Sequence, residues 1–496
     1  MTMTALAWRT RFREALSCDL RSLAVFRIAL GVYIVADTAA RFIHLERHYT
    51  DSGIVPVPLA RKLLEAQGYW SLHTLGGGVA FQVFLFSLTF IAGLSVLLGY
   101  RTFWATLAGY VLISSMHQRF AWGAYPGDFM ARTSALASLL APTGAMWSID
   151  ARRKPAGAVT HFGPGSVALT VFTVTFVFYA AVSKVGPSWR EGTAAFWVLD
   201  NTEYGRHVLD WFFDKPLLIK LATWGVLVVE GSSVLLLTPL GVGRVRVCIT
   251  LPFSLLLTTF LFSLDLWLFP FMMAGCIAAL LPSWFWDSLV PRLPLLRARL
   301  RAPTPIDPPH ASGARVPWAR WGCAAVFCAV ILQDHARKIG EAGYFNPAPV
   351  QPSAPVEQAI RALGIKDDWT IFRIPEKYPS GWDAIAGTLA DGTRVNVFTG
   401  QPMDLTAPPL PGALVGGFRD KRMFLFLNWK VPTIKLRWDE LAREQYQQIA
   451  RYHCRESHGR LTSVEIWKVV HEMRPPPVLH LAPVPQNIFS MRCDQT

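Results

Sequence analysis

Charged residues are scarce in this chain. They make up 17% of the 496 residues, whereas hydrophobic residues make up 52%. Soluble domains carry about 25% charged residues, so this composition argues against an ordinary soluble enzyme and against a disordered chain. The apolar runs are continuous and do not alternate with polar residues, which also excludes a transmembrane β-barrel. Composition therefore predicts a helical membrane protein.

The charges that are present are unevenly distributed. Charged residues are about 14% of residues 1–334 and about 22% of residues 335–496. This contrast separates an apolar body from a water-soluble tail and predicts a mainly α fold, a polytopic membrane helix bundle followed by a small extracytoplasmic α/β domain. The predicted divisions are a cytoplasmic N-terminus, a transmembrane domain, a Pro-rich linker and the tail domain, at residues 1–19, 20–334, 335–355 and 356–496.

Apolar segments of suitable length predict nine membrane spans, since a span needs about 20 apolar residues. They lie near 20–40, 76–98, 103–117, 128–142, 166–184, 217–238, 247–262, 264–282 and 318–334. Basic groups precede the first, fifth, seventh and ninth of them, and these groups are Arg9, Arg11, Arg13 and Arg21; Arg152, Arg153 and Lys154; Arg244 and Arg246; and Arg292, Arg297, Arg299, Arg301 and Arg315. With nine spans, every group falls on one side, which the positive-inside rule makes the cytoplasm.

This topology accounts for the net charge of +14. Basic residues gather at span ends and are not interleaved with aromatic residues in one polar region, so the charge indicates a lipid bilayer as partner and no nucleic acid. The protein is expected in the inner membrane as a multi-pass protein with its tail outside. No apolar stretch of signal-peptide length precedes Leu20, so no cleavable signal is expected.

The seven cysteines lack metal-binding or redox spacing, and no metal is predicted. Cys454 and Cys493 in the tail could form a disulfide, and only in an oxidising compartment. No Ser-His-Asp set or phosphate-binding loop is present. His453, Cys454 and His458 lie together at a helix end, with spacing unsuited to a metal.

The tail shows a mixed α/β pattern. Asp391-Gly392 lies between AIAGTL and TRVNVF, which predicts a hairpin because glycine supplies the positive φ of a tight turn. RWDELAREQYQQIARYH places its apolar residues on one helical face, and SVEIWKVV predicts a further strand. A small domain without chemistry of its own explains this pattern as well as a functional one does.

Charged residues inside spans are costly unless they are paired or hydrated, so each is a candidate functional residue. Near the outer face these are Asp37, Asp128, Arg132, Lys184 and Lys220. Asp128 and Arg132 are four residues apart and can pair on one helix turn.

Two further charges are predicted deeper in the bundle. Arg27 and Glu230 are each expected about 10–12 Å below the cytoplasmic surface, at 1.5 Å per helical residue. Their similar depth predicts a structural ion pair that locks the bundle.

Lys184 admits two interpretations. A lysine that ends an apolar helix commonly extends its ammonium to the membrane surface as an anchor. Here Gly186-Pro187 follows at once, and this turn could instead hold the amine in a poorly hydrated pocket beside Trp189. Desolvation disfavours an ammonium, which would make Lys184 a usable general base.

Three segments resemble a known membrane module. SLAVFRIALG, YTDSGIVP and FYAAVSKVGPSWREGTA are similar to the horizontally transferred transmembrane (HTTM) domain, which vitamin K-dependent gamma-carboxylase shares with many bacterial proteins. The resemblance covers about residues 18–335, and its most specific part is the lysine-to-tryptophan spacing of SKVGPSW. DDWTIF, SGWDAIAGTLADGTRVNVF and RYHCRE resemble the extracytoplasmic tail of bacterial members.

The resemblance implies chemistry for Lys184. In the carboxylase the lysine of this motif activates a reduced quinone, which with O2 becomes a strongly basic alkoxide; the alkoxide removes the γ-proton of a peptide glutamate, and the carbanion captures CO2. The implied cofactors are thus a reduced quinone of vitamin K or menaquinone type, O2 and CO2. The implied partner is an extracytoplasmic protein or peptide substrate. Lys184 is the expected catalytic residue, with Asp128, Arg132 and Trp189 as auxiliary residues near it.

The sequence also departs from the carboxylase. Asp128 stands where the carboxylase carries a histidine at the start of the fourth span, and residues 247–282 contain no histidine where the family has one. The tail is also much shorter than the luminal region of the carboxylase.

The leading hypothesis is a quinol-dependent carboxylase or oxygenase-type enzyme, a carbon-carbon lyase, with its site on the extracytoplasmic side. The alternative is a non-enzymatic membrane scaffold or assembly factor whose tail binds a partner. A transporter is disfavoured because the sequence shows no half-helices and no carboxylate cluster at the bilayer midplane.

Overall fold

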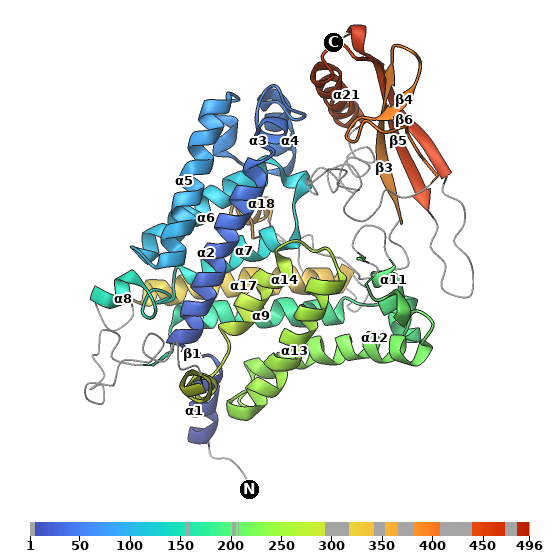
Figure 1. Ribbon diagram of the computed structural model, residues 1–496. Coiled ribbons are helices and arrows are strands. Elements are labelled where there is room, and N and C mark those ends of the chain that lie inside the picture. Colours follow the sequence, from blue (N-terminus) through green and yellow to red (C-terminus); the bar gives the residue numbers. More distant parts are fainter. Residues whose placement is uncertain are drawn as a thin grey trace.

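The protein is a helical bundle that carries a small antiparallel sheet at one end (Figure 1). The computed structural model describes residues 5–153, 159–200, 205–206, 208–292, 317–341, 353–365, 380–406, 439–471 and 484–495. Several features named above lie outside these residues, namely Lys154, Arg297, Arg299, Arg301, Arg315, DDWTIF and most of the Pro-rich linker.

The first half of the bundle extends from α1 to α9. In chain order its elements are α1 (Ala5–Ala15), β1 (Cys18–Asp19), α2 (Leu20–Phe42), α3 (Leu45–Tyr49), α4 (Val57–Gln67), η1 (Leu72–Thr74), α5 (Val79–Leu98), α6 (Thr102–Arg119), η2 (Ala121–Gly123), α7 (Pro126–Ser138), α8 (Ile149–Arg153), β2 (Thr160–His161) and α9 (Pro164–Val182).

The second half surrounds the end of α9. Its elements are α10 (Pro187–Glu191), α11 (Ala194–Leu199), η3 (Asp210–Phe212), α12 (Pro216–Gly231), η4 (Ser232–Leu237), α13 (Gly243–Ser263), α14 (Phe269–Ala278), α15 (Ser283–Leu289), η5 (Val290–Arg292) and α17 (Trp318–Glu341).

Five helical segments are long and apolar enough to cross a membrane: α2, α5, α9, α12 with η4, and α13. The bent pair formed by α14 and the helix of residues 283–292 makes a sixth if it is one span. Each of the nine predicted spans contains a helix, but α7 has only 13 residues, about 20 Å at 1.5 Å per residue. The end of α6, SSMHQR, and the end of α17, QDHARKIGE, are polar. Nine crossings remain a prediction.

The predicted span 264–282 begins later in the structure. Leu264 and Leu266 lie before the helix, α14 starts at Phe269, and it has 10 residues. Pro270 explains the start, because proline is favoured in the first helical turn, where its missing N–H is not needed.

Close helix packing holds the bundle together. α2 lies along α5, and α9 lies along both α17 and α12. At Gly31 a Cβ atom would lie 2.5 Å from the backbone N and Cα of Leu97. Glycine therefore allows α2 and α5 to approach as membrane helices with small interface residues do.

The tail is an α/β unit as predicted. Its elements are α18 (Ala354–Ala362), β3 (Ser380–Leu389), β4 (Arg394–Asn396), α21 (Asp439–Glu456), β5 (Leu461–His471), β6 (Val484–Arg492) and η8 (Cys493–Gln495). The sheet is antiparallel throughout, in the order β4-β3-β5-β6, and α21 packs on β5 and β6. The predicted hairpin is confirmed, and Gly392 in its turn has φ +87°.

The tail has one edge strand that was not predicted and one disulfide between the two cysteines that the sequence singled out. β6, which contains Pro485, pairs with β5 at the edge of the sheet, where a proline removes no inner hydrogen bond. A disulfide joins Cys454 of α21 to Cys493 of η8. This bond links α21 to the segment that follows β6.

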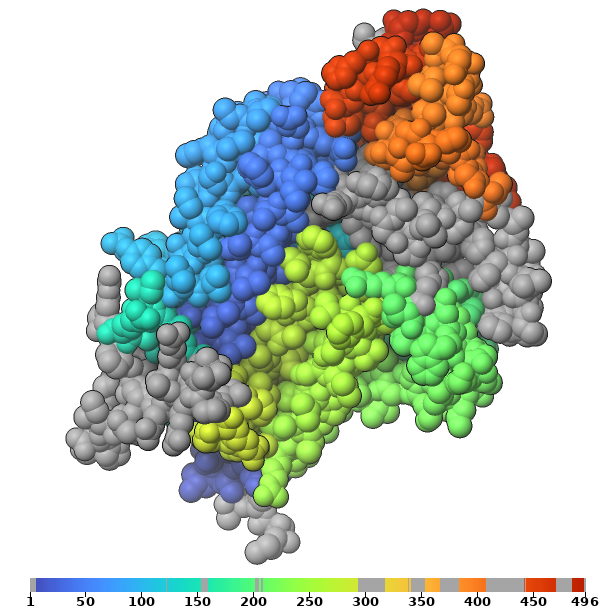
Figure 2. Space-filling view, viewed as in Figure 1, coloured from blue at the N-terminus to red at the C-terminus, as the bar shows by residue number. Residues whose placement is uncertain are grey.

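The tail docks on the loop between α2 and α5. Lys62 of α4 forms an ion pair of 2.9 Å with Glu444 of α21, and Arg455 donates a hydrogen bond of 2.8 Å to the carbonyl oxygen of Ser52. Figures 1 and 2 show the tail, in orange and red, at the end of the molecule opposite α1.

A second contact fixes the C-terminal end of α18. Trp70 Nε1 donates to the carbonyl oxygen of Ala362 at 2.6 Å, and the Tyr110 hydroxyl donates to that of Leu363 at 2.7 Å. These bonds satisfy carbonyl groups that a helix end leaves without a partner in the helix. Tail and bundle are therefore joined at two separate places.

Candidate functional site

Lys184 is buried in an ion pair with Glu230. α9 ends at Val182, and the lysine side chain folds back along the helix so that Nζ donates to the carbonyl oxygen of Ala180 at 2.8 Å. The same Nζ lies 2.5 Å from Glu230 Oε2 on α12. Each side chain is 7% exposed. The ammonium thus points into the protein.

Trp189 covers the other side of the amine. Its ring centroid lies 5.3 Å from Lys184 Nζ, within the range of a cation–π contact. Pro187 begins α10 and Gly192, with φ +79°, ends it, so a single short turn of helix carries the tryptophan back over the lysine. The backbone carbonyl oxygen of Trp189 accepts a hydrogen bond from Trp224 Nε1 at 3.2 Å. The Gly-Pro turn therefore places an aromatic face beside the amine.

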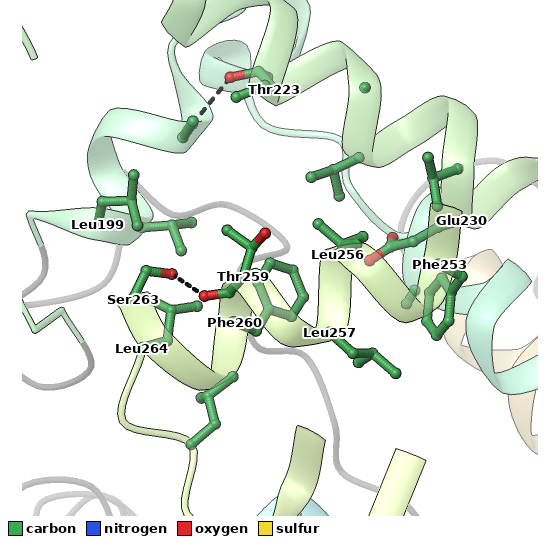
Figure 3. A pocket seen from close by; sticks show the side chains of 18 of the residues that line it. Leu199, Thr223, Glu230, Phe253, Leu256, Leu257, Thr259, Phe260, Ser263 and Leu264 are labelled. Carbon is green, nitrogen blue, oxygen red and sulfur yellow. Dashed lines mark hydrogen bonds between the residues drawn. The ribbon is translucent and has the colours of Figure 1, made fainter. Parts of the chain in front are cut away.

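A cavity of about 410 Å³ opens beside this pair. Its walls come from α9, α10, α11, η3, α12, α13 and α14, and most of the lining is aliphatic or aromatic. In Figure 3 the Glu230 carboxylate reaches in from the helix wall across from Leu256 and Phe253. The labelled part of the lining consists of Leu199, Thr223, Glu230, Phe253, Leu256, Leu257, Thr259, Phe260, Ser263 and Leu264.

The polar groups of the lining are mostly used within the protein. Thr259 and Ser263 donate to backbone carbonyl oxygens of their own helix, and Thr223 bonds to α11 and to Gly192. Among the described lining residues, Lys184 and Glu230 carry the only charges. Because an ammonium has three N–H donors and two are used here, one donor remains for a ligand.

The predicted ion pair between Arg27 and Glu230 is wrong. Arg27 donates instead to the carbonyl oxygens of Met146 and Trp147, at 3.2 and 2.6 Å. The prediction failed because it compared depths along separate helices and ignored the reach of Lys184. The Lys184 side chain turns inward from the end of α9 and forms the ion pair with Glu230.

Asp128 lies on α7, behind two phenylalanines that line the cavity. Phe176 and Phe269 line the cavity, and Phe129 of α7 stacks on Phe176 with ring centroids 6.0 Å apart. Gly127 packs on α14, where a Cβ atom would lie 3.2 Å from Phe269 Cα. Among the residues that line the cavity, neither Asp128 nor Arg132 is found. The auxiliary role expected of both residues therefore stays a prediction, whereas Trp189 does lie beside the lysine.

Asp128 belongs to a second buried charged cluster. Arg41 Nη2 lies 2.9 Å from Asp128 Oδ2, and Arg41 Nε lies 2.9 Å from Asp37 Oδ2. His117 Nε2 is 2.9 Å from Asp37, and the Tyr33 hydroxyl donates to Asp128 at 2.7 Å. All of these side chains are buried. The cluster joins α2, α6 and α7 through buried charges and hydrogen bonds.

Arg132 does not form the predicted pair with Asp128. No hydrogen bond or ion pair of Arg132 is found among the described residues, and its Nε is buried. Its guanidinium lies beside Gly364, just past the C-terminal end of α18, where a positive charge complements the helix dipole. Asp128 instead forms an ion pair with Arg41, which lies on α2.

Three residues of this cluster have the geometry of metal ligands. One ligand atom from each of Asp37, His117 and Asp128 lies within 4.8 Å of the others. However, the Arg41 guanidinium bonds to both carboxylates and supplies the positive charge that a metal would bring. The donor set therefore fits an arginine-centred network better than a cation site.

Sequence reasoning did not assign this cluster a role. The sequence indicates Asp37 as a charge within a span, but it singles out neither His117 nor Arg41. The one local signal was the spacing of four between Asp37 and Arg41, which places them on one helix face. The other contacts join residues far apart in sequence.

Burial shifts the pKa values of Asp383 and His453 in the tail. Burial raises the pKa of Asp383 on β3 to about 7, against the opposing charge of Lys468, its neighbour across the sheet. Burial lowers the pKa of His453 to about 3, and the nearby Arg47 adds to that shift. His453 is therefore neutral at physiological pH.

Comparison of the chain with family models, with curated proteins and with solved structures found no match. The site is consequently interpreted from its own geometry. An amine and a carboxylate share a short hydrogen bond in the wall of an apolar cavity. This arrangement can bind a hydroxyl group of an apolar ligand and exchange a proton with it.

Proposed function

We propose that the protein is an integral membrane enzyme that binds a reduced quinone and deprotonates it, as part of a carboxylase or oxygenase-type reaction. The observation that carries the proposal is the cavity of about 410 Å³ with the Lys184–Glu230 pair as its charged group. The proposal also takes up the resemblance of SKVGPSW to the quinone-activating motif of the gamma-carboxylase.

The residues of the cavity fit a quinol. Ligand pockets commonly measure about 300–1,000 Å³ and combine apolar walls with a few polar groups that orient the ligand. The phenylalanines and leucines of α9, α13 and α14 suit a fused aromatic ring with a hydrocarbon chain. The pair of Lys184 and Glu230 suits a ring hydroxyl. When bound, a reduced quinone would supply, together with O2, the strong base that the proposed reaction requires.

Lys184 and Glu230 have distinct tasks in this proposal. An amine accepts a proton only in its neutral form, and the carboxylate 2.5 Å away can hold the proton that Lys184 must first give up. Lys184 then takes the proton of the ligand hydroxyl. Trp189 and the apolar walls exclude water, so that a hydroxyl group deprotonated here is not quenched by solvent.

Two observations support an extracytoplasmic tail on an inner-membrane protein. α1 and the tail lie at opposite ends of the molecule, which an odd number of crossings requires (Figure 1). The disulfide between Cys454 and Cys493 suits an oxidising compartment. Both agree with the placement of basic residues at the cytoplasmic side.

Lys184→Arg tests the enzymatic proposal, since arginine keeps the charge but cannot deprotonate near neutral pH. Glutamates of the host's membrane and extracytoplasmic proteins are scanned by mass spectrometry for one added CO2, at matched abundance of the two forms. The modification should disappear in Lys184→Arg and persist in Lys220→Arg, a matched change at an exposed lysine of α12. Modification that survives in Lys184→Arg would rule out the lysine as the base.

Binding is tested separately with menaquinol and the purified protein under nitrogen. Quenching of tryptophan fluorescence should saturate, and Leu257→Phe, which narrows the cavity without adding a tryptophan, should weaken the quenching. Equal quenching of both forms would show that the quinol lies elsewhere.

A second candidate is a non-enzymatic scaffold whose tail binds a partner. The observation that favours it is the ion pair itself, because a buried pair can lock α9 to α12 without any chemistry. The double variant Lys184→Met/Glu230→Leu separates the two functions. A scaffold keeps its phenotype in this variant if the protein accumulates, whereas the proposed enzyme loses it.

A further inference from the structure

The N-terminal helix α1 is fixed to the bundle by a buried arginine. Arg246 of α13 donates from Nη2 to the carbonyl oxygen of Ala15 at 2.9 Å and from Nη1 to that of Ser17 at 3.2 Å. These carbonyl groups lie at the C-terminal end of α1, where a cation also complements the helix dipole. Although the side chains of α1 are exposed, the helix has a defined position on the end of the bundle.

A groove runs between α1 and two connecting segments. Its volume is about 370 Å³. Its lining is Trp8, Arg9, Phe12, Arg13, Phe162 and Pro239. The Arg13 guanidinium lies 5.0 Å from the centroid of the Phe162 ring, so that an arginine and an aromatic ring meet across it. Trp8 and Phe12 are 45% and 48% exposed, which is a costly arrangement in water.

The groove lies at the edge of the membrane. α2 starts five residues after α1 ends, α9 starts two residues after Phe162, and η4 ends two residues before Pro239. α13 starts nearby, because its Arg246 contacts α1. Each of these helices belongs to a candidate membrane span. Four span ends therefore meet here, at the level where lipid headgroups lie.

The two arginines of the groove share one side of α1. Arg9 and Arg13 are four residues apart, about 40° around a helix, whereas Arg11 is about 160° away from Arg9. Trp8 and Phe12 form the adjacent stripe. α1 thus presents two guanidinium groups next to two large aromatic side chains, and its one acidic residue, Glu14, does not line the groove.

We propose that this groove binds an anionic phospholipid of the bilayer. Arg9 and Arg13 contact the phosphate, since guanidinium groups form paired hydrogen bonds with phosphate oxygens. Trp8, Phe12, Phe162 and Pro239 contact the glycerol backbone and the first part of an acyl chain, as aromatic side chains do at membrane interfaces. A soluble anion would leave the aromatic side chains uncovered, which is why a lipid is the better occupant.

The test uses the full-length protein in a neutral detergent, titrated with phosphatidylglycerol or phosphatidylcholine and followed by native mass spectrometry. The first phosphatidylglycerol should bind more tightly than the first phosphatidylcholine, which carries the phosphate but no net charge. One basic residue near an anionic lipid contributes about 1 kcal/mol, so Arg9→Gln and Arg13→Gln should each weaken the first phosphatidylglycerol about fivefold.

Arg11→Gln is the matched control, because it removes the same charge from the same helix outside the groove. It should change the affinity less than twofold. Equal weakening by all three variants would mean that charge attracts the lipid without a site, and would overturn the proposal. Displacement of the lipid by inorganic phosphate would overturn it as well. Each variant is checked by gel filtration and thermal melting, and Trp8→Ala supplies a second variant that retains every charge.

Discussion

Breaking the Lys184–Glu230 pair on one side should destabilise the bundle more than replacing both partners. Lys184→Met leaves a carboxylate, and Glu230→Leu leaves an ammonium, buried with 7% exposure and without its partner. The loss of one partner of a buried pair costs about 3–5 kcal/mol, whereas apolar replacement of both is often neutral or stabilising. The double variant should therefore be more stable than either single variant.

The expected shifts are large enough for a thermal melt. A change of 1 kcal/mol moves the melting temperature of a domain of 150–250 residues by about 2–4 °C, and the lower value suits a larger membrane domain. Each single variant should then melt about 6–10 °C below the parent protein, and the double variant within about 2 °C of it. The assay is differential scanning fluorimetry of the detergent-solubilised protein with a thiol-reactive dye.

An exposed pair provides the matched control. Lys62 and Glu444 are 58% and 34% exposed, and their charged atoms lie 2.9 Å apart. Exposed ion pairs contribute less than about 1 kcal/mol, so Lys62→Met should lower the melting temperature by less than about 2 °C. Single variants of Lys184 and Glu230 that melt like Lys62→Met, or a double variant whose shift equals the sum of the two, would refute the reasoning.

Three further perturbations have defined outcomes. Arg41→Gln leaves two buried carboxylates without their shared cation and should lower the melting temperature by about 6 °C or more. Because the pKa of Asp383 is raised, the folded tail holds the proton of this carboxyl group more tightly than the unfolded tail does. The free energy of unfolding should therefore fall as pH rises from about 4 to about 7 and then level off. Chemical denaturation of Asp383→Asn over the same pH range should not show this fall. Replacing Cys454 and Cys493 with serine opens a loop of 39 residues and should cost the tail about 4 kcal/mol, seen as an earlier calorimetric transition that reducing agent no longer shifts.

Local patterns in the sequence predicted local structure. The hairpin at Asp391-Gly392, the amphipathic helix α21 and strand β5 all depend on the spacing of apolar residues or on one turn, and the structure contains them. The apolar spans likewise appear as helices, because a run of apolar residues in a membrane must satisfy its own backbone hydrogen bonds.

Pairings between helices could not be predicted in the same way. Which charge meets Glu230 depends on the rotation of α12 about its axis and on its displacement along α9, and neither quantity is encoded in the spacing of residues within one helix. A lysine side chain also extends several ångströms from its backbone, so the position of the backbone does not fix the position of the ammonium group. The same limit applies to Asp128, whose partner Arg41 lies 87 residues away. Its near neighbour Arg132 was the simpler but incorrect choice.

The docking of the tail has a consequence for biosynthesis. Lys62 and Glu444 are separated by 382 residues, and translation at about 5–20 residues per second needs about 20–75 s to cover that distance. During this time the loop that contains α3 and α4 has left the ribosome without the helix that will cover it. The nascent chain therefore leaves this surface of the loop uncovered for that interval, and a segment that is synthesised late completes one that is synthesised early.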